Sequence, residues 1–150
     1  MNIAGLDIGT HAGWATAHDA GTWNLTPRSH ESSGIRLLKF RASLTELIRL
    51  AHLDLIGYED AGFLAKAGAS AAVVYGELLG VLKTVCEDMH VQYVGFKPAA
   101  IKKLATGKGN ANKEQMLTAA RRQWPGLTIP DDNTADALWT REAAVREYGQ

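Results

Sequence analysis

Several features that would restrict the class of this protein are scarce or absent. The sequence has one cysteine, Cys86, in 150 residues, which excludes a disulfide framework and a multi-cysteine zinc site. It has no uninterrupted apolar run near the ~18 residues of a membrane-spanning helix, so no membrane contact is expected. The amino terminus lacks a basic stretch followed by an apolar core and a cleavage site, which argues against secretion. We therefore expect one domain over residues 1–150, acting in the cytoplasm, because a chain of this length buries an adequate core without crosslinks.

An excess of one charge is also absent, since 16 Lys and Arg residues balance 16 Asp and Glu residues. Overall neutrality argues weakly against a nucleic-acid partner, but the position of the charges matters more than their sum. Residues 97–122 hold seven cations and one acid, whereas residues 131–150 hold five acids and two bases. This asymmetry fits a phosphate-binding surface beside a metal-binding cluster. On charge alone, a solvated helix face is the simpler interpretation.

The hydrophobic pattern predicts three strands joined by tight turns and then alternating helices and strands. The expected strands cover residues 2–8, 13–17, 22–27, 53–58 and 91–96. The expected helices cover residues 34–51, 65–89, a short segment from Pro98, a segment from Lys113 to before Pro125, and 133–146. Such an order indicates an α/β fold with a mixed five-stranded sheet and helices on both faces.

Three carboxylates occur where an apolar element makes a charge expensive. Asp7 lies inside an apolar strand, Glu59 ends the fourth expected strand, and Asp136 begins an apolar helix. An unpaired buried carboxylate costs several kcal/mol, so a fold retains one only with a partner or a function. Asn133 precedes Asp136 by three residues and projects from the same helical face. Structural roles remain open: a turn residue, a strand-end charge, or a helix cap at Asp132 or Asn133 with Asp136 as its capping-box partner.

If these acids converge from two strands and a helix, they repel one another and their pKa values rise unless a cation lies among them. Hard divalent ions such as Mg²⁺ take oxygen ligands of this kind. Two such ions ~4 Å apart suit hydrolysis of a phosphodiester, because they bind both the attacking and the leaving oxygen.

Five segments, in order along the chain, resemble the RuvC family of Holliday-junction resolvases, which have the RNase H-like fold. The first, GLDIGTHAGWA at 5–15, is similar to the family's first-strand motif, and Glu59 after LDLIGY matches the glutamate of the fourth strand. YGELLGVL at 75–82 resembles the helix that pairs protomers. KPAAIKKLATGKGNANKEQM at 97–116 resembles the basic segment, and DDNTADALW at 131–139 the final acidic helix. The compact form is similar to phage and prophage members.

The resemblance implies a set of catalytic and metal-binding residues. Asp7, Glu59 and Asp136 match the metal ligands, and Asn133 stands where the cellular family more often has a fourth acid. An amide oxygen still ligates a metal but adds no charge, so either Asn133 completes a weaker site or Asp132 takes part of that role.

Several lysines match positions that the family uses for catalysis or for contact with DNA. Lys113 matches the lysine beside the scissile phosphate, and Lys102 matches a second lysine along the DNA path. The basic segment adds Lys97, Lys103 and Lys108 as DNA-binding candidates. Phe63 lies near the loop where family members place an aromatic wedge, with core packing as the alternative.

The implied function is a structure-selective endodeoxyribonuclease that depends on Mg²⁺, with Mn²⁺ as a substitute. As the family does, it would act as a homodimer on four-way junctions and other branched DNA, with paired symmetric nicks. The host would be a bacterium or a phage-infected bacterial cell. Alternatives are another RNase H-like nuclease acting on branched DNA or RNA–DNA hybrids, or a junction-binding protein without catalysis. GLDIGT at 5–10 also resembles the first hairpin of actin-like and sugar-kinase ATPases, but those proteins need two such domains and a longer chain.

Overall fold

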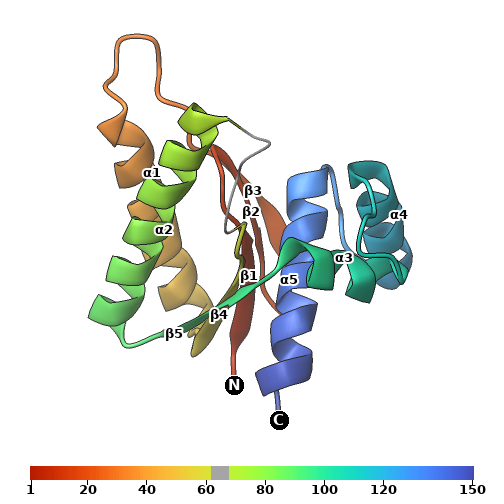
Figure 1. Cartoon of the computed structure of the whole chain (residues 1–150). Helices are drawn as coiled ribbons and strands as arrows, with labels where there is room; N and C mark the ends of the chain where they lie inside the picture. Colours follow the sequence, from red (N-terminus) through yellow and green to blue (C-terminus); the bar gives the residue numbers. More distant parts are fainter. Residues whose placement is uncertain (62–67) are drawn as a thin grey trace.

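A twisted sheet forms the centre of the protein in the computed structural model, which describes residues 1–61 and 68–150 (Figure 1). Its five strands are β1 (Ile3–Asp7), β2 (His11–Ala15), β3 (Ala20–Asn24), β4 (Leu55–Glu59) and β5 (Gln92–Phe96). They lie in the order β3-β2-β1-β4-β5. The β1–β2 and β2–β3 pairs are antiparallel, and the β1–β4 and β4–β5 pairs are parallel. The prediction of a mixed five-stranded sheet is therefore confirmed.

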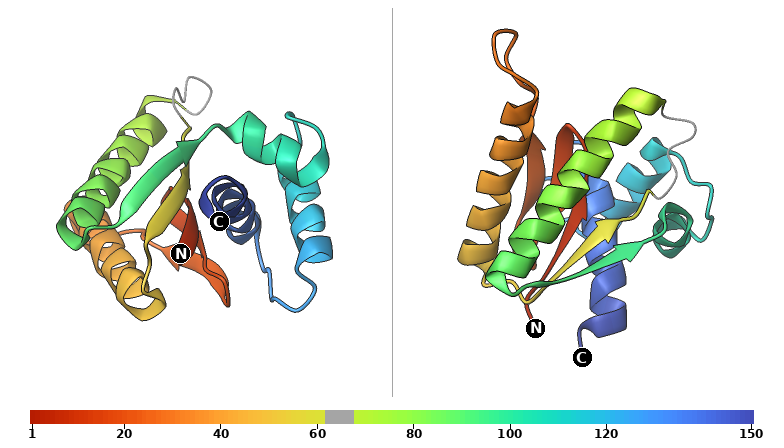
Figure 2. Two further views of the ribbon diagram at one scale, coloured as in Figure 1. Left: turned by 90° about the horizontal axis from the view of Figure 1, so that it is seen from below. Right: turned by 60° about the vertical axis from the view of Figure 1, so that its left-hand side comes forward.

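Helices cover both faces of this sheet, as the sequence pattern predicts (Figure 2). One face carries α1 (Gly34–Ala51) and α2 (Ala69–Met89), which pack side by side. The other face carries α5 (Asp132–Tyr148), and α3 (Pro98–Thr106) and α4 (Lys113–Gln123) pack against α5 from outside. The basic segment of the sequence thus lies on the α5 side of the sheet.

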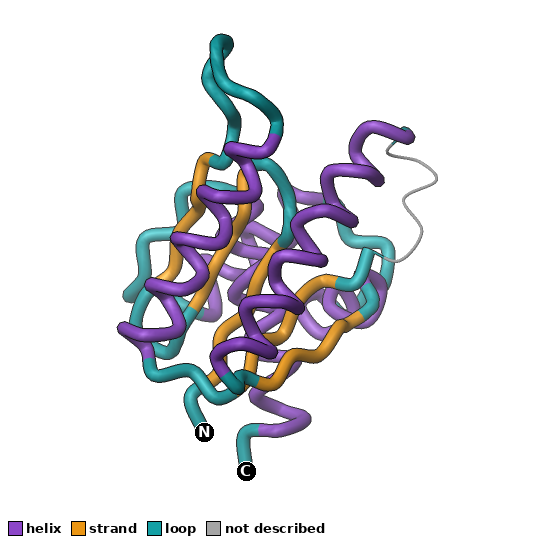
Figure 3. Tube along the Cα trace, turned by 90° about the vertical axis from the view of Figure 1, so that its left-hand side faces the viewer, coloured by secondary structure: helices purple, strands orange, loops and turns teal. Residues whose placement is uncertain are grey.

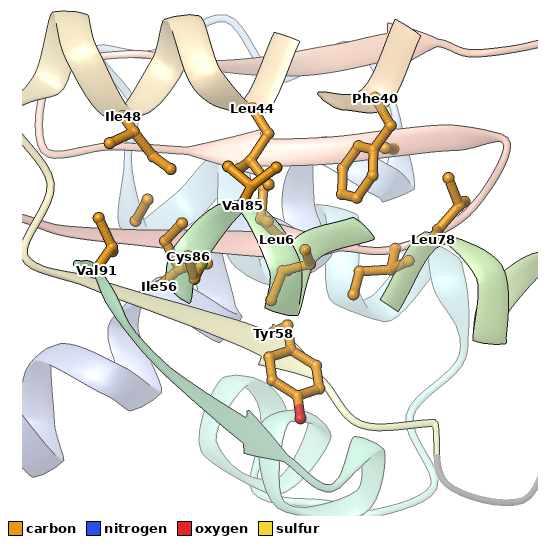
Figure 4. Packing of buried hydrophobic residues seen from close by; sticks show 14 of the residues in the cluster. Leu6, Phe40, Leu44, Ile48, Ile56, Tyr58, Leu78, Val85, Cys86 and Val91 are labelled. Carbon is orange, nitrogen blue, oxygen red and sulfur yellow. The ribbon is translucent and has the colours of Figure 1, made fainter. Parts of the chain in front are cut away.

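The larger hydrophobic core fills the space between the sheet and the α1–α2 layer (Figure 4). Phe40, Leu44 and Ile48 recur every four residues along α1, so they share one helical face and are buried there. From the opposite side Leu6 of β1 and Ile56 of β4 meet them, and both are almost inaccessible to solvent. This core holds β1 and β4 in position. Two of the predicted site residues, Asp7 and Glu59, lie at the carboxyl ends of these strands.

Helix α5 lies unusually close to the sheet because two glycines face it. A side-chain carbon at Gly5 of β1 would overlap the carbonyl oxygen of Ala137, and one at Gly13 of β2 would overlap that of Asn133. Glycine therefore allows backbone to contact backbone along β1 and β2. The close approach brings the first two turns of α5 level with the carboxyl end of β1.

The second and third strands begin and end earlier than the sequence pattern predicted. The expected ranges were 13–17 and 22–27, whereas β2 and β3 cover His11–Ala15 and Ala20–Asn24. The turn between them is made by Thr16 and Asp19: Thr16 donates its backbone N–H to the Asp19 carbonyl oxygen at 2.8 Å, and its hydroxyl oxygen accepts the Asp19 N–H at 3.2 Å. This turn sets the antiparallel register in which Ala15 pairs with Ala20.

One helix among the described residues, α2, is long and apolar enough to span a membrane, by length and composition only. Its mean hydropathy is 1.4 over its best window, within Ala69–Met89. Glu77 and Lys83 interrupt it, so it contains no uninterrupted apolar run of ~18 residues, as the sequence indicates. One face of the helix, including Leu78, Leu82 and Cys86, is buried against the sheet and α1, so α2 forms part of the core layer.

Candidate metal centre

Three carboxylates from separate elements converge at one edge of the sheet. Asp7 ends β1 and Glu59 ends β4, and because Leu6 pairs with Tyr58 in the parallel register, the two acids follow as neighbours. Asp136 reaches them from the second turn of α5. One oxygen from each of Asp7, Glu59 and Asp136 lies within 4.8 Å of the other two. The predicted convergence of two strand ends and a helix is therefore present.

The environment of these acids opposes their ionisation. Burial, followed by the charges of Glu59, Asp136 and Asp132, raises the pKa of Asp7 well above its usual value. Burial, followed by the charges of Glu59 and Asp132, raises the pKa of Asp136 to about 7. Burial also raises the pKa of Glu59, although the charge of Lys102 opposes the shift. The cluster therefore holds protons that a bound cation would displace.

The donor set fits a hard divalent cation. Oxygen ligands from three carboxylates, within reach of one another and partly buried, match the preference of Mg²⁺ or Mn²⁺. Asp7 and Glu59 also line an open cavity of about 410 Å³, together with Gly9 and Thr10 of the turn after β1. The cavity gives a ligand access to the acids, so this is a candidate metal centre that opens to solvent.

The first turn of α5 corrects the predicted helix cap. Asp131 is the cap: its Oδ1 accepts the backbone N–H of Thr134 at 2.8 Å and the Thr134 hydroxyl at 2.6 Å. The same oxygen accepts the hydroxyl of Thr22, a β3 residue, at 2.9 Å. Burial alone would raise the pKa of Asp131, but these hydrogen bonds hold it below its usual value. Since Asp131 caps the helix, the side chains of Asp132 and Asn133 are not used as caps and are free to act on the metal centre.

Asp132 and Asn133 have different surroundings. The charge of Asp132 contributes to the raised pKa values of Asp7 and Asp136, so its carboxylate acts on the cluster. The backbone carbonyl of Asn133 is the group against which Gly13 packs, which anchors this turn on β2.

Two of the predicted lysines act electrostatically on the acids. Lys113, the first residue of α4, has its Nζ 3.4 Å from Oδ2 of Asp132, and its charge lowers the pKa values of Asp7 and Asp136. Lys102 of α3 lowers the pKa values of Glu59 and Asp136. A capping box between Asn112 and Gln115 fixes the start of α4, with hydrogen bonds of 2.8 and 2.9 Å. The capping box thus fixes the backbone at Lys113, whose side chain pairs with Asp132.

The other DNA-binding candidates of the basic segment are exposed. Lys97, Lys103 and Lys108 lie on α3 and on its flanking segments, and none of them is among the cations that shift the pKa values of the three acids. Phe63 lies outside the described residues.

Tyr75 is a site residue that sequence reasoning did not find. Its hydroxyl donates to the backbone carbonyl of Glu59 at 2.9 Å and accepts the N–H of Ala61 at 3.2 Å. Tyr75 lies on α2 and lines the same cavity as Asp7. Burial raises its pKa to about 12, so the hydroxyl keeps its proton. It fixes the main chain at the end of β4, a role that no sequence motif indicated.

The fold and the acid cluster together define an α/β protein with a candidate divalent-metal site at the edge of its sheet. The profile of the crossover junction endodeoxyribonuclease RuvC family matches residues 10–140, which begins just after Asp7. The chain belongs to the RuvC family.

Individual relatives agree with this assignment. The chain is 28% identical over 149 residues to the crossover junction endodeoxyribonuclease RuvC of Cereibacter sphaeroides, covering 92% of this chain and 85% of that protein. It is 31% identical over 147 residues to the corresponding Dehalococcoides mccartyi protein, covering 92% and 87%. Among solved structures, Thermus thermophilus RuvC in complex with a Holliday junction substrate aligns with a TM-score of 0.76 at 23% identity, covering 94% of this chain and 90% of that one. The fold is therefore of the RNase H-like type.

Proposed function

We propose that this chain is a structure-selective endodeoxyribonuclease that resolves four-way DNA junctions by Mg²⁺-dependent hydrolysis. The observation that carries the proposal is the cluster of Asp7, Glu59 and Asp136, with oxygens within 4.8 Å, in a member of the RuvC family. Further support comes from the T. thermophilus relative, whose structure contains a Holliday junction substrate. As a bacterial or phage enzyme, the protein would act in the bacterial cytoplasm.

In this proposal the three carboxylates hold Mg²⁺, for which Mn²⁺ substitutes. The bound ions supply positive charge that activates water and stabilises the leaving oxygen of the phosphodiester. Asp7, Glu59 and Asp136 would hold that charge between them, and Asp7 and Glu59 also line the cavity. Lys113 and Lys102 stand beside them and stabilise charge that develops on the phosphoryl oxygens, which accelerates the reaction because the interaction strengthens in the transition state.

The fourth negative charge of the site comes, in this proposal, from Asp132 rather than from Asn133. Asp132 acts electrostatically on both Asp7 and Asp136, and its Oδ2 forms an ion pair with the Nζ of Lys113 at 3.4 Å. Comparing Asp132→Asn with Asn133→Asp tests this assignment. We expect the first variant to raise the half-saturating Mg²⁺ concentration several-fold. An unchanged value for Asp132→Asn together with a lowered value for Asn133→Asp would assign the fourth position to Asn133 instead.

The proposed active unit is a homodimer that pairs through the outer face of α2. Ala72, Gly76 and Gly80 recur every four residues on this exposed face, and a side-chain carbon at either glycine would meet no atom within 4 Å. Small residues at this spacing let a second helix approach closely. A two-fold dimer places two sites symmetrically on a junction, as two paired nicks require.

The proposed DNA path crosses the basic surface beside the metal centre. Lys97, Lys103 and Lys108 would bind backbone phosphates along α3 and the segment before α4, so affinity should fall as salt rises.

The test is cleavage of a labelled four-way junction, a matched duplex and an RNA–DNA hybrid, each with Mg²⁺ and with chelator. We expect paired symmetric nicks in the junction alone, and none with chelator. Cleavage of the hybrid would indicate another RNase H-like nuclease. Tight junction binding without cleavage in either Mg²⁺ or Mn²⁺ would indicate a binding protein.

A further inference from the structure

We propose that the β3–α1 loop (residues 25–33) is a second DNA-contacting element, which binds the phosphate backbone of a duplex arm across the metal centre from the basic segment. This inference rests on the proposed function, since it names a further contact for the same substrate. The loop rises beyond the body of the protein, at the end where β1 and β3 finish (Figure 1, Figure 3).

The base of the loop is tied to the turn that follows the site residue of β1. Leu25 donates its backbone N–H to the carbonyl oxygen of Thr10 at 2.8 Å, and its side chain is buried in the main core. Thr10 in turn lines the cavity that contains Asp7. The loop therefore starts from a fixed point beside the turn that lines the cavity of Asp7.

The stem of the loop is held against α1. Lys39 donates from its Nζ to the carbonyl oxygen of Thr26 at 3.0 Å. The same Nζ is 3.9 Å from Oε1 of Glu31. A projection of nine residues with such internal contacts loses less conformational entropy on binding than a free chain does.

The tip is a closed turn from Arg28 to Glu31. Glu31 donates its N–H to the Arg28 carbonyl oxygen at 2.9 Å, and Oε1 of Glu31 accepts the Arg28 N–H at 2.8 Å. Glu31 is the single acid of residues 25–33. Its carboxylate contacts the Lys39 ammonium group and the Arg28 backbone N–H. Arg28 and His30 are exposed, and within residues 1–61 and 68–150 the Arg28 guanidinium makes no hydrogen bond or ion pair.

The cation that the tip presents to solvent is Arg28, whose backbone the turn fixes. A guanidinium on a fixed turn is suited to the paired oxygens of a phosphate, and the exposed hydroxyl of Ser29 adds a neutral donor. The loop leads into α1 on one side of the sheet, whereas α3 and α4 lie with α5 on the other side (Figure 1). A duplex arm seated over the metal centre thus meets cations on both sides.

The test measures binding of the full chain to a labelled four-way junction and to a linear duplex, in chelator so that no cleavage occurs, over a series of salt concentrations. The variant is Arg28→Ala with His30→Ala. The matched control is Arg49→Ala, which removes an exposed arginine from the last turn of α1, at the far end of that helix from the loop. We expect the double variant to bind the junction about 5–10-fold more weakly at low salt. The slope of log affinity against log salt should fall by about one, because each lost phosphate contact removes roughly 0.9 from it.

The outcomes test the role of the loop and the proposed function separately. If the double variant matches the wild type in affinity and slope, the inference is wrong, and the same result for Arg49→Ala as for the double variant would also overturn it. If the wild type binds duplex but shows no preference for the junction, the proposed function fails while the duplex series still tests the loop.

Discussion

Replacing Asp136 by asparagine should stabilise the metal-free protein while it abolishes cleavage. The carboxyl of Asp136 has its pKa raised from 3.8 to about 7, chiefly by burial and then by the charges of Glu59 and Asp132. Such a group is protonated in the folded state and ionised in the unfolded state between these two values. The folded state thus binds more protons, so stability falls as pH rises through this range.

The magnitude follows from the size of the shift. About three pKa units at about 1.4 kcal/mol each give roughly 4 kcal/mol of destabilisation above pH 7. Because Asp136 is partly exposed, screening reduces this value, and we expect about 2–4 kcal/mol. For a chain of 150 residues this corresponds to a difference in Tm of about 5–15 °C. An asparagine side chain has nearly the same shape as aspartate without the charge, so the variant escapes the penalty.

The assay is thermal and urea unfolding of wild type and Asp136→Asn in chelator from pH 5 to pH 8, repeated with saturating Mg²⁺. The variant should be more stable than the wild type at pH 8, with a gap that narrows toward pH 5. Mg²⁺ should raise the Tm of the wild type and have little effect on the variant. Glu46→Gln, which removes an exposed acid from α1, is the charge-matched control. A variant that is less stable at pH 8, or a gap independent of pH, would refute the reasoning.

Three further substitutions test the positioning of the site. Lys113→Ala should slow single-turnover cleavage about 10–100-fold and change junction affinity less than about threefold; an unchanged rate would remove this lysine from the mechanism. Tyr75→Phe removes the hydroxyl that holds the end of β4, so Mg²⁺ binding measured by calorimetry should weaken several-fold, with about 1 kcal/mol lost in urea unfolding. If Tyr75→Phe and the wild type bind Mg²⁺ with equal affinity, Tyr75 contributes to core packing and does not position the metal centre. Gly13→Ala should destabilise the fold by about 1–3 kcal/mol, because its new carbon overlaps the Asn133 carbonyl, whereas Gly126→Ala, in open space, should not.

The order of elements was predictable from the sequence because each strand and helix has a clear hydrophobic period. The apolar run before Asp7, the four-residue spacing along α1 and the apolar stretch before Glu59 each determine one element. Boundaries were less predictable, since a polar side chain can begin a turn at several neighbouring positions. The cap of α5 is Asp131 rather than its two neighbours because Thr22, 109 residues away, donates a hydrogen bond to that oxygen.

The acids of the candidate centre were visible in the sequence because a carboxylate in an apolar element is itself unusual. Asp7 and Glu59 end apolar strands and Asp136 lies in the second turn of α5, and the structure brings the three together. Tyr75 was invisible because its contact with the carbonyl of Glu59 joins two elements through space. A tyrosine on an apolar helix face carries no sequence signal that separates a core residue from one that positions a site.

The close packing of α5 against the sheet explains how the three acids come together at the candidate metal centre. Gly5 and Gly13 let the helix backbone contact the strands, and this contact carries Asp136 to the ends of β1 and β4. A larger residue at either position would hold the helix away and reduce the repulsion among the acids, but it would also separate their oxygens. Burial is the largest cause of the raised pKa values of Asp7 and Asp136, and repulsion among the acids adds to it, so an ion that neutralises the cluster should recover part of this free energy. We therefore expect a change in the approach of α5 to the sheet to alter both the stability of the metal-free protein and its affinity for the proposed ion.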